Sequence, residues 1–213
     1  MRIPPGPLTN ALVIANILVG LLLLWPSAWE VSVMAGALVP ARFSMGDAAF
    51  ADVPYLLPVW LTPFSSAFLH GGILHLVLNM AMLLLMGRMT ERVLGWQGLG
   101  LLYVVGIVAS ALAEFVAHPH SQIPVIGASG AISAVIAVYM ILFPNSEPKP
   151  WGPMPAKIAR PLQLLLMWVL INLMIGYAGP GMGLGIAIWP HIGGFIAGLL
   201  LAKPLLRWRY RNA

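Results

Sequence analysis

The sequence predicts an all-α, polytopic membrane protein built as a bundle of six transmembrane helices. Of its 213 residues, 60% are apolar and only 8% are charged, and the mean hydropathy is +0.91, a composition outside the range of soluble globular domains. Six apolar segments are close to the roughly 17 to 25 residues that cross a bilayer as a helix. Alternating segments of about ten residues, which form transmembrane β-barrels, do not occur in the sequence. We expect residues 1–213 to form one transmembrane domain.

The expected spans follow the apolar runs, which few or no charges interrupt. They cover approximately residues 8–25, 72–89, 99–116, 125–143, 162–178 and 190–206. The first span could instead be a cleaved signal peptide, because Arg2 supplies a positive start and Ser27-Ala28 a small-residue cleavage site. Its apolar stretch exceeds a typical signal-peptide core of roughly 7 to 15 residues, so a retained helix is favoured.

The basic residues predict the orientation of the spans. With six spans both termini lie on one side, which also holds ten of the 11 Lys and Arg residues, whereas Arg42 lies on the other. The positive-inside rule makes the shared side cytoplasmic. A pI near 10.0 then reflects a surface that faces anionic lipid, and no nucleic-acid partner is expected.

Two outer connections stand out by length or composition. About 45 residues separate the first and second spans, and a loop this long usually has a function. Within it Trp60, Phe64 and Phe68 have the spacing of one helix face, which would suit a short helix in the membrane interface. The connection between the fifth and sixth spans is rich in glycine around residues 176–185, so its backbone is expected to move.

Four polar side chains lie near the outer ends of three predicted spans. His75 and Asn79 belong to the second span, Ser129 to the fourth and His191 to the sixth. These spans all run inward from the outer face, so at about 1.5 Å per residue each side chain lies within roughly 2 to 11 Å of its helix start. Polar groups inside a membrane usually face the bundle interior. We therefore expect one shared polar pocket.

The residue types in this pocket suit acyl transfer. A serine paired with a histidine is the minimum for nucleophilic catalysis, and no carboxylate is placed to orient His191, so a dyad is expected rather than a triad. His75 and Asn79 share one helix face and, with the amide of Ser129, could donate hydrogen bonds to an oxyanion. The N-terminal end of the fourth span adds free amides and a favourable dipole.

Small residues beside the pocket indicate close helix packing. Gly194 and Gly198 form a small-xxx-small face on the sixth span, and Ser129, Ser133 and Ala137 form one on the fourth. Such faces let two backbones approach closely, which would bring the serine to the histidine. Each polar residue taken alone also has a structural interpretation, since membrane serines and histidines often bond only to a neighbouring turn or helix.

These motifs resemble the rhomboid intramembrane serine proteases. The matching text is His70-Gly71-Gly72-Ile73-Leu74-His75-Leu76-Val77-Leu78-Asn79, then Gly127-Ala128-Ser129-Gly130, then His191-Ile192-Gly193-Gly194 with Gly198. The resemblance covers nearly the whole chain and implies a rhomboid-like bundle. It implies that Ser129 is the nucleophile and His191 its base, that His75, Asn79 and the Ser129 amide are the oxyanion donors, and that the structural residues near the site are His70, Gly127, Gly130, Gly194 and Gly198.

The same resemblance implies a function. A rhomboid of the bacterial, six-transmembrane type would cleave transmembrane segments of other membrane proteins near the extracytoplasmic face through an acyl-enzyme, in the plasma (inner) membrane and with both termini cytoplasmic. Its partners would be transmembrane protein substrates and membrane lipid; no cofactor, metal or particular oligomeric state is expected. The first outer loop would lie half-buried in the membrane, and the fifth span with the glycine-rich loop would gate substrate entry.

Two positions depart from the family pattern, and two other function classes stay open. Trp60 precedes Leu61 where many rhomboids have a Trp-Arg pair, and Ser133 stands where some have an aromatic residue on the catalytic histidine. A non-catalytic rhomboid-like binder typically lacks the serine or the histidine, and a solute transporter should have a polar path across the membrane. Metalloprotease and aspartyl intramembrane protease chemistry is excluded, because the sequence has no His-Glu-x-x-His motif and no paired intramembrane aspartates.

Overall fold

The computed structural model of the chain describes residues 4–50, 52–53, 55–144, 150–178 and 187–211. Its helices are α1 (Pro7–Leu22), α2 (Pro26–Gly36), α3 (Pro40–Met45), η1 (Asp47–Phe50), η2 (Val59–Leu61), α4 (Thr62–Ser66), α5 (Ile73–Met82), η3 (Leu83–Gly87), α6 (Arg88–Ala117), α7 (Ser129–Leu142), α8 (Ala156–Ala178) and α9 (Ile188–Arg209). Among the described residues the β-structure consists of two isolated bridges. The predicted all-helical, polytopic bundle is confirmed.

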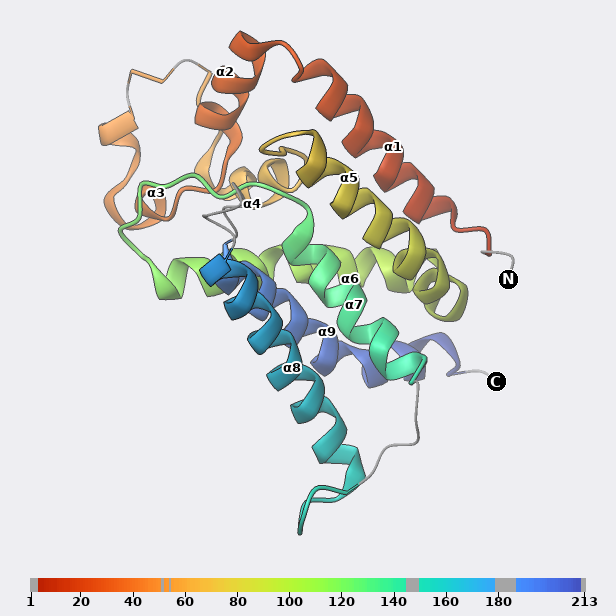
Figure 1. Cartoon of the computed structure of the whole chain (residues 1–213). Helices are drawn as coiled ribbons and strands as arrows, with labels where there is room; N and C mark the ends of the chain where they lie inside the picture. Colours follow the sequence, from red (N-terminus) through yellow and green to blue (C-terminus); the bar gives the residue numbers. More distant parts are fainter. Residues whose placement is uncertain (1–3, 51, 54, 145–149, 179–186, 212–213) are drawn as a thin grey trace.

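Apolar helices of membrane-crossing length account for the bundle. Within the described chain, Ile73–Ala117, Ala156–Met174 and Ile188–Arg209 are long and apolar enough to cross a bilayer, while α1 and α7 are apolar but shorter. Ile73–Ala117 makes two passes, because the non-helical backbone of Gly95 (φ 75°, ψ 165°) reverses the chain. Figure 1 shows α1 and α5 lying side by side and α6 returning beneath them.

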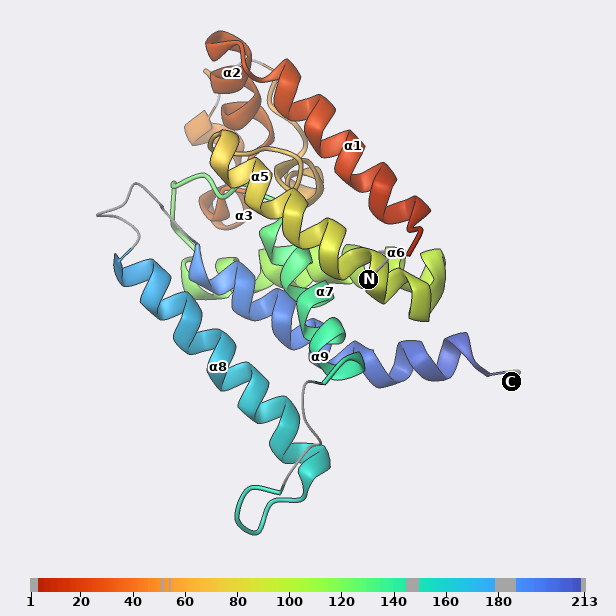
Figure 2. The same cartoon turned by 45° about the vertical axis from the view of Figure 1, so that its right-hand side comes forward.

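α7 is the centre of the bundle. Its residues from Gly130 to Val138 are all buried, because α6 and α9 cover it (Figure 2). α8 lies at the edge: its C-terminal half contacts α9, and its N-terminal half diverges from the other helices in both views. The centre of the bundle therefore holds the start of α7 between neighbours on several sides.

Helix ends differ from the predicted spans for identifiable reasons. α7 begins at Ser129 rather than near residue 125, because Val125 pairs with Leu38 in an antiparallel bridge and the Gly127 amide donates to Ser66 O at 2.8 Å. The helices α8 and α9 extend beyond the predicted ranges 162–178 and 190–206. Hydropathy marks the part of a helix inside the bilayer, whereas charged residues continue the helix beyond it.

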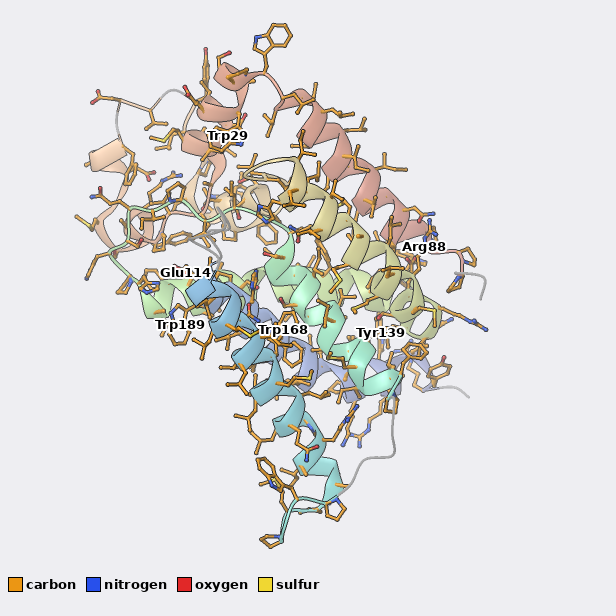
Figure 3. All side chains as sticks on the ribbon, in the orientation of Figure 1. Trp29, Arg88, Glu114, Tyr139, Trp168 and Trp189 are labelled. Carbon is orange, nitrogen blue, oxygen red and sulfur yellow. The ribbon has the colours of Figure 1, made fainter. Side chains whose placement is uncertain are left out.

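Both described ends of the chain lie beside the turn at Gly95 within α6. The Thr9 amide and hydroxyl donate to Glu91 Oε2 at 2.9 and 2.7 Å, and the Leu8 amide donates to Glu91 Oε1 at 2.9 Å. At the other terminus the Tyr210 hydroxyl donates to Val93 O at 3.0 Å. In Figure 3 Arg88 marks this end of the bundle, named here the Arg88 end, and Glu114 on α6 marks the opposite, Glu114 end.

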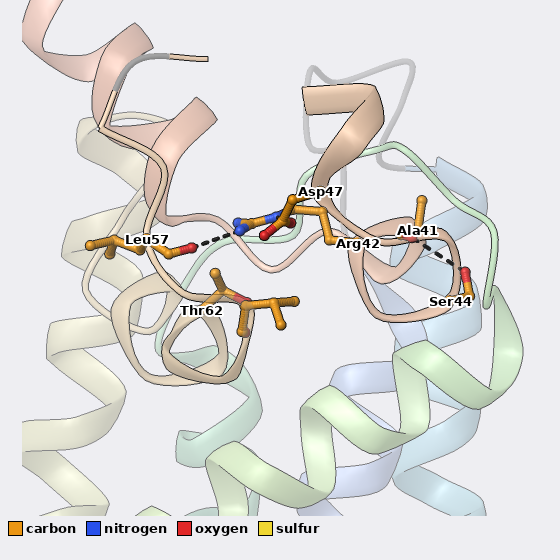
Figure 4. A network of polar contacts seen from close by, with 7 residues as sticks. Ala41, Arg42, Ser44, Asp47, Leu57 and Thr62 are labelled. Carbon is orange, nitrogen blue, oxygen red and sulfur yellow. Dashed lines mark hydrogen bonds and ion pairs between the residues drawn. The ribbon is translucent and has the colours of Figure 1, made fainter. Parts of the chain in front are cut away.

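The long connection between α1 and α5 is folded around a buried arginine. Arg42 is 2% exposed; its Nε donates to Asp47 Oδ1 at 2.7 Å and its Nη2 to Leu57 O at 2.6 Å (Figure 4). The guanidinium thus joins two distant parts of the connection, as its fork of donors allows. An arginine therefore organises this loop even though none follows Trp60.

The prediction that three aromatic residues of this loop share one helix face is wrong. Trp60 lies in η2 and is 65% exposed, whereas Phe64 in α4 and Phe68 beyond it pack against the bundle core. The three side chains do not share one helix, because η2 and α4 are short helices of different type. The glycine-rich connection predicted before α9 lies mostly at residues 179–186, outside the described residues.

Candidate active site

Ser129 and His191 meet near the Glu114 end of the bundle. The Ser129 Oγ lies 2.7 Å from His191 Nε2, although 62 residues separate them in sequence. Both residues are half-buried, so the contact is sheltered and still reachable from outside. A serine hydroxyl that can donate to an imidazole nitrogen has the geometry of a nucleophile and its base.

The backbone before α7 places Ser129 at the first position of that helix. Gly127 has φ +121°, a conformation that favours glycine, and its amide is held by Ser66 O. The hydrogen bond from Ile132 N to Ala128 O, at 2.9 Å, marks the start of the helix. The amide of Ser129 therefore lies among the N-terminal donors that have no acceptor within the helix.

Glycine contacts set the separation of α7 and α9. A Cβ on Gly194 would collide with the Gly130 carbonyl, and one on Gly198 would collide with the Ala134 carbonyl. A Cβ on Gly130 would in turn collide with the Ser110 side chain on α6. The small face of α9 thus meets Gly130 and Ala134 on α7. Of the predicted partner face, Ala137 also lies against Gly198, whereas Ser129 and Ser133 are not among the atoms nearest to either glycine.

His75 lies across Gly127 from the serine. A Cβ on Gly127 would be 2.9 Å from His75 Cε1 and Nε2, and 3.6 Å from Ser129 Oγ. Because Gly127 has no side chain, a space remains there with the His75 imidazole on one side and the Ser129 hydroxyl on the other. The Gly71 amide donates to His75 Nδ1 at 3.3 Å, so His75 Nε2 is the ring nitrogen that faces this space.

Asn79 lies one turn deeper on the same face of α5. It is 6% exposed, and its Nδ2 donates to His75 O at 2.9 Å. This bond to the preceding turn uses one of its two amide protons, which leaves the second as a further donor. The structure thus brings His75, Ser129 and His191 together and keeps Asn79 tied to its own helix.

His70 supports His75 from the segment before α5. The two rings lie edge to face with centroids 5.0 Å apart, and Trp29 Nε1 donates to His70 O at 3.0 Å. Burial, with the nearby His75 imidazole as a second cause, lowers the pKa of His70 to about 4. His70 is therefore neutral near pH 7 and packs as an uncharged ring.

The structure adds a residue that the motifs do not contain. Asn172 on α8 places Oδ1 2.6 Å from His191 Nδ1. Trp168, one turn earlier on α8, points toward α9 (Figure 3), donates from Nε1 to His191 O at 3.3 Å, and stacks on Phe195 with centroids 5.0 Å apart. The signal for Asn172 in the sequence is an amide inside an apolar span, the same kind of signal as Ser129.

Comparison with known families decides which group of proteins this is. A family model described as the Rhomboid domain matches residues 58–208, more than half of the 213 residues. The chain belongs to the rhomboid family. The matched range holds both residues of the Ser129 and His191 pair and both polar residues of α5. This rhomboid is thus a multi-pass membrane protein, and the predicted resemblance is confirmed.

Relatives of this rhomboid occur in plants, animals and bacteria. RHOMBOID-like protein 4 of Arabidopsis thaliana is 34% identical over 144 residues, 67% of this chain and 33% of that protein. Rhomboid-related protein 3 of Homo sapiens is 31% identical over 157 residues, 66% of this chain and 35% of that protein. Rhomboid protease GlpG of Pectobacterium atrosepticum is 30% identical over 197 residues, 92% of this chain and 62% of that protein. The chain spans about a third of the first two relatives and less than two thirds of the third.

Proposed function

We propose that this rhomboid is an intramembrane serine endopeptidase that cleaves transmembrane segments of other membrane proteins near the extracytoplasmic face. The 2.7 Å contact between Ser129 Oγ and His191 Nε2 carries the proposal, because it joins a nucleophile and a base from two different helices. The similarity to the bacterial rhomboid protease GlpG supports the same chemistry.

In the first step Ser129 is the nucleophile. Its Oγ attacks the carbonyl carbon of a substrate peptide bond while the hydroxyl proton passes to His191 Nε2. The C–N bond then breaks, and the same proton passes from Nε2 to the leaving amine. The product of this step is an ester between Ser129 and the N-terminal part of the substrate, the acyl-enzyme.

The oxyanion of the tetrahedral intermediate forms over Gly127. Donors there would be the Ser129 amide, His75 Nε2–H and the second amide proton of Asn79. Fixed donors of this kind stabilise developing negative charge at little reorganisation cost, and one such donor is worth about 10²- to 10³-fold in kcat. Asn79 keeps one amide proton on the preceding turn, and its second amide proton is the one offered to the oxyanion.

Water completes the reaction. His191 takes a proton from a water molecule that attacks the ester carbonyl; when the C–O bond breaks, this proton passes from Nε2 to Ser129 Oγ, which restores the hydroxyl and the neutral histidine. Both dyad residues are half-buried, so water can reach the ester from the end of the bundle. A site at the centre of the bilayer would lack this supply.

The substrate class follows from the surroundings of the dyad. A substrate helix would enter from the lipid beside α8, since this helix lies at the edge of the bundle (Figure 2) and its C-terminal half lies against His191. Entry from the lipid selects transmembrane proteins. We propose membrane lipid as the other partner, and neither a metal nor a cofactor takes part in the proposed steps.

The distribution of charge supports a topology with both termini in the cytoplasm of a bacterium and the dyad toward the outer face of its plasma (inner) membrane. Arg88 and Arg92 lie in the first turns of α6, before the reversal at Gly95, and Arg207 and Arg209 lie in the last turn of α9. All four lie at the Arg88 end, away from Ser129. Positive residues remain on the cytoplasmic side.

Cleavage of a model single-span substrate in proteoliposomes tests the proposal. The protein should release two fragments, and Ser129→Ala should release none above background. Ser133→Ala is the matched control, because it removes a hydroxyl one turn along the same helix whose bond goes to Ser129 O at 2.7 Å. Unchanged cleavage by Ser129→Ala contradicts the proposal, and substrate binding by the wild type without cleavage indicates the non-catalytic binder.

A further inference from the structure

We infer that Asn172 is a positioning residue that holds His191 in the tautomer and orientation needed by Ser129. The inference rests on the proposed function, because only a histidine that acts as a base needs a fixed tautomer. It adds a third, uncharged member to the predicted dyad. No carboxylate is required in that place, since an amide oxygen can accept the same hydrogen bond.

The orientation of the Asn172 amide is fixed by its own helix. Its Nδ2 donates to Trp168 O at 2.9 Å, and a carbonyl oxygen can only accept, so the amide nitrogen must face Trp168. The amide oxygen must then face His191, where Oδ1 and Nδ1 are 2.6 Å apart. Asn172 is only 3% exposed, so bulk water has little access to compete for either bond.

This orientation selects one tautomer of His191. An amide oxygen is only an acceptor, so His191 Nδ1 must carry the ring proton of the neutral imidazole. The other nitrogen, Nε2, then has a free lone pair 2.7 Å from Ser129 Oγ. In the opposite tautomer an N–H would face the serine and a lone pair would face the Asn172 oxygen, and the histidine could not accept the hydroxyl proton.

Asn172 keeps its bond throughout the reaction. When Ser129 Oγ bonds to the substrate carbonyl carbon, its proton moves to Nε2 and the imidazolium carries protons on both nitrogens. The Nδ1–H continues to donate to Asn172 Oδ1 until the proton on Nε2 passes to the leaving amine. A neutral amide stabilises this cation less than a carboxylate does, so the effect of Asn172 is mainly on orientation.

Both supports of His191 described here come from α8. Asn172 holds the side chain, and Trp168 Nε1 donates to the main-chain oxygen of His191 at 3.3 Å. The Ser133 hydroxyl bonds to Ser129 O rather than to the imidazole. The base is therefore positioned by the edge helix of the bundle.

Two substitutions separate positioning from folding. Asn172→Leu keeps the volume and removes the acceptor, whereas Asn172→Asp keeps an acceptor oxygen. The matched control is Asn16→Leu, because Asn16 on α1 is 0% exposed and its Nδ2 donates to Leu12 O at 2.8 Å, the same bond to the preceding turn without a histidine partner. For each variant kcat and KM are measured across the pH range in which histidine titrates, together with the rate at which a fluorophosphonate labels Ser129.

The fluorophosphonate rate reports on the dyad without a substrate helix. Asn172→Leu should lower kcat and the labelling rate by the same factor and leave KM unchanged. The expected loss is at least about tenfold, a part of the 10²- to 10⁴-fold rate enhancement that a general base contributes. Asn172→Asp should recover most of the rate, and the acid limb of its pH profile should move to higher pH, because a carboxylate stabilises the imidazolium. Asn16→Leu should change neither the labelling rate nor the pH profile.

Results that contradict the role of Asn172 can be distinguished from results that contradict the proposed function. The positioning role is overturned if Asn172→Leu has the labelling rate and pH profile of the wild type. It is also overturned if Asn16→Leu loses as much labelling rate as Asn172→Leu. Neither result affects the Ser129 and His191 chemistry. If Asn172→Leu does not fold, Asn172→Asp decides, since an unmoved acid limb contradicts the inference. The proposed function itself fails only if Ser129→Ala still cleaves or the wild type neither cleaves nor labels.

Discussion

Gly194 of α9 packs on the carbonyl of Gly130 of α7 with no room for a Cβ between them. One turn later, Gly198 meets the carbonyl of Ala134 in the same way. These contacts set the distance between the two helix backbones, and Ser129 and His191 lie at the adjoining helix ends. The 2.7 Å contact of the dyad thus depends on the lack of a side chain at Gly194 and Gly198 in the helix interface.

Gly194→Ala is expected to impair activity more than stability. The added methyl group must push α9 away from α7, at a cost of about 1 to 3 kcal/mol for overpacking, and a displacement of about 1 Å at a catalytic group can reduce the rate about 100-fold. Cleavage kinetics and the free energy of unfolding in a detergent titration measure the two effects.

Gly36→Ala is the control for this prediction. A Cβ on Gly36 of α2 would make only ordinary contacts with the Leu57 and Ser65 side chains, the nearest at 3.5 Å. Its cleavage rate should match the wild type. If Gly194→Ala cleaves as fast as Gly36→Ala, the packing of α7 on α9 does not control the geometry of the site.

Glu91 is expected to be required for the stability of α1. Its carboxylate accepts three hydrogen bonds from Leu8 and Thr9, and it is 4% exposed. In Glu91→Gln a neutral amide with one acceptor oxygen leaves donors of the α1 N-terminus unpaired, which should cost about 2 kcal/mol. The free energy of unfolding checks this value, with Glu30→Gln at an exposed position as control, and an equal effect of both substitutions contradicts it.

Much of the fold could be predicted because a bilayer imposes simple rules. Apolar length predicts the spans, and the basic residues predict their common direction. The start of α7 was misplaced because Val125 and Gly127 are apolar or small and yet belong to an extended segment, held by contacts with Leu38 and Ser66. Contacts between segments that are distant in sequence leave no local pattern.

In the site, too, some residues could be predicted from local sequence and others could not. Ser129 and His191 follow from motifs and depth, whereas Asn172 lies in a span where no motif surrounds it. Arg42 could be recognised as the one basic residue on the outer side, but its partners, Asp47 and Leu57 O, could not. Their distances depend on how the long connection folds, which charge and hydropathy do not encode.

Arg42→Lys is expected to destabilise this connection. Lysine has one terminal nitrogen, which cannot occupy the positions of both Nε and Nη2, so the buried bond to Leu57 O is lost, at a cost of about 1 to 3 kcal/mol. The Asp47 side chain is 48% exposed, so its share is small. Unfolding measurements that compare Arg42→Lys with Arg92→Lys, an exposed arginine at the Arg88 end, test this, and equal stability of the two variants argues against it.

His70 should make stability depend on pH in the acidic range. Its pKa is lowered from 6.5 to about 4 by burial first and by His75 second, so the unfolded chain binds a proton more readily than the folded one. The stability from a neutral His70 is present above pH 6.5 and is lost as the pH falls toward 4.

His70→Gln should therefore flatten this part of the curve of unfolding free energy against pH. His120→Gln, at an exposed position, should leave the slope as it is in the wild type. A slope that is unchanged in His70→Gln would mean that His70 is protonated as easily in the folded protein as in the unfolded chain.

Covalent labelling tests the central claim most directly. The protein in membranes is treated with a fluorophosphonate, and mass spectrometry of its peptides locates the modified residue. The account predicts modification at Ser129 in the wild type, none at that peptide in Ser129→Ala, and a large loss in His191→Ala, where the base is missing. Folded protein that never labels at Ser129, or that labels equally well without His191, would contradict the account.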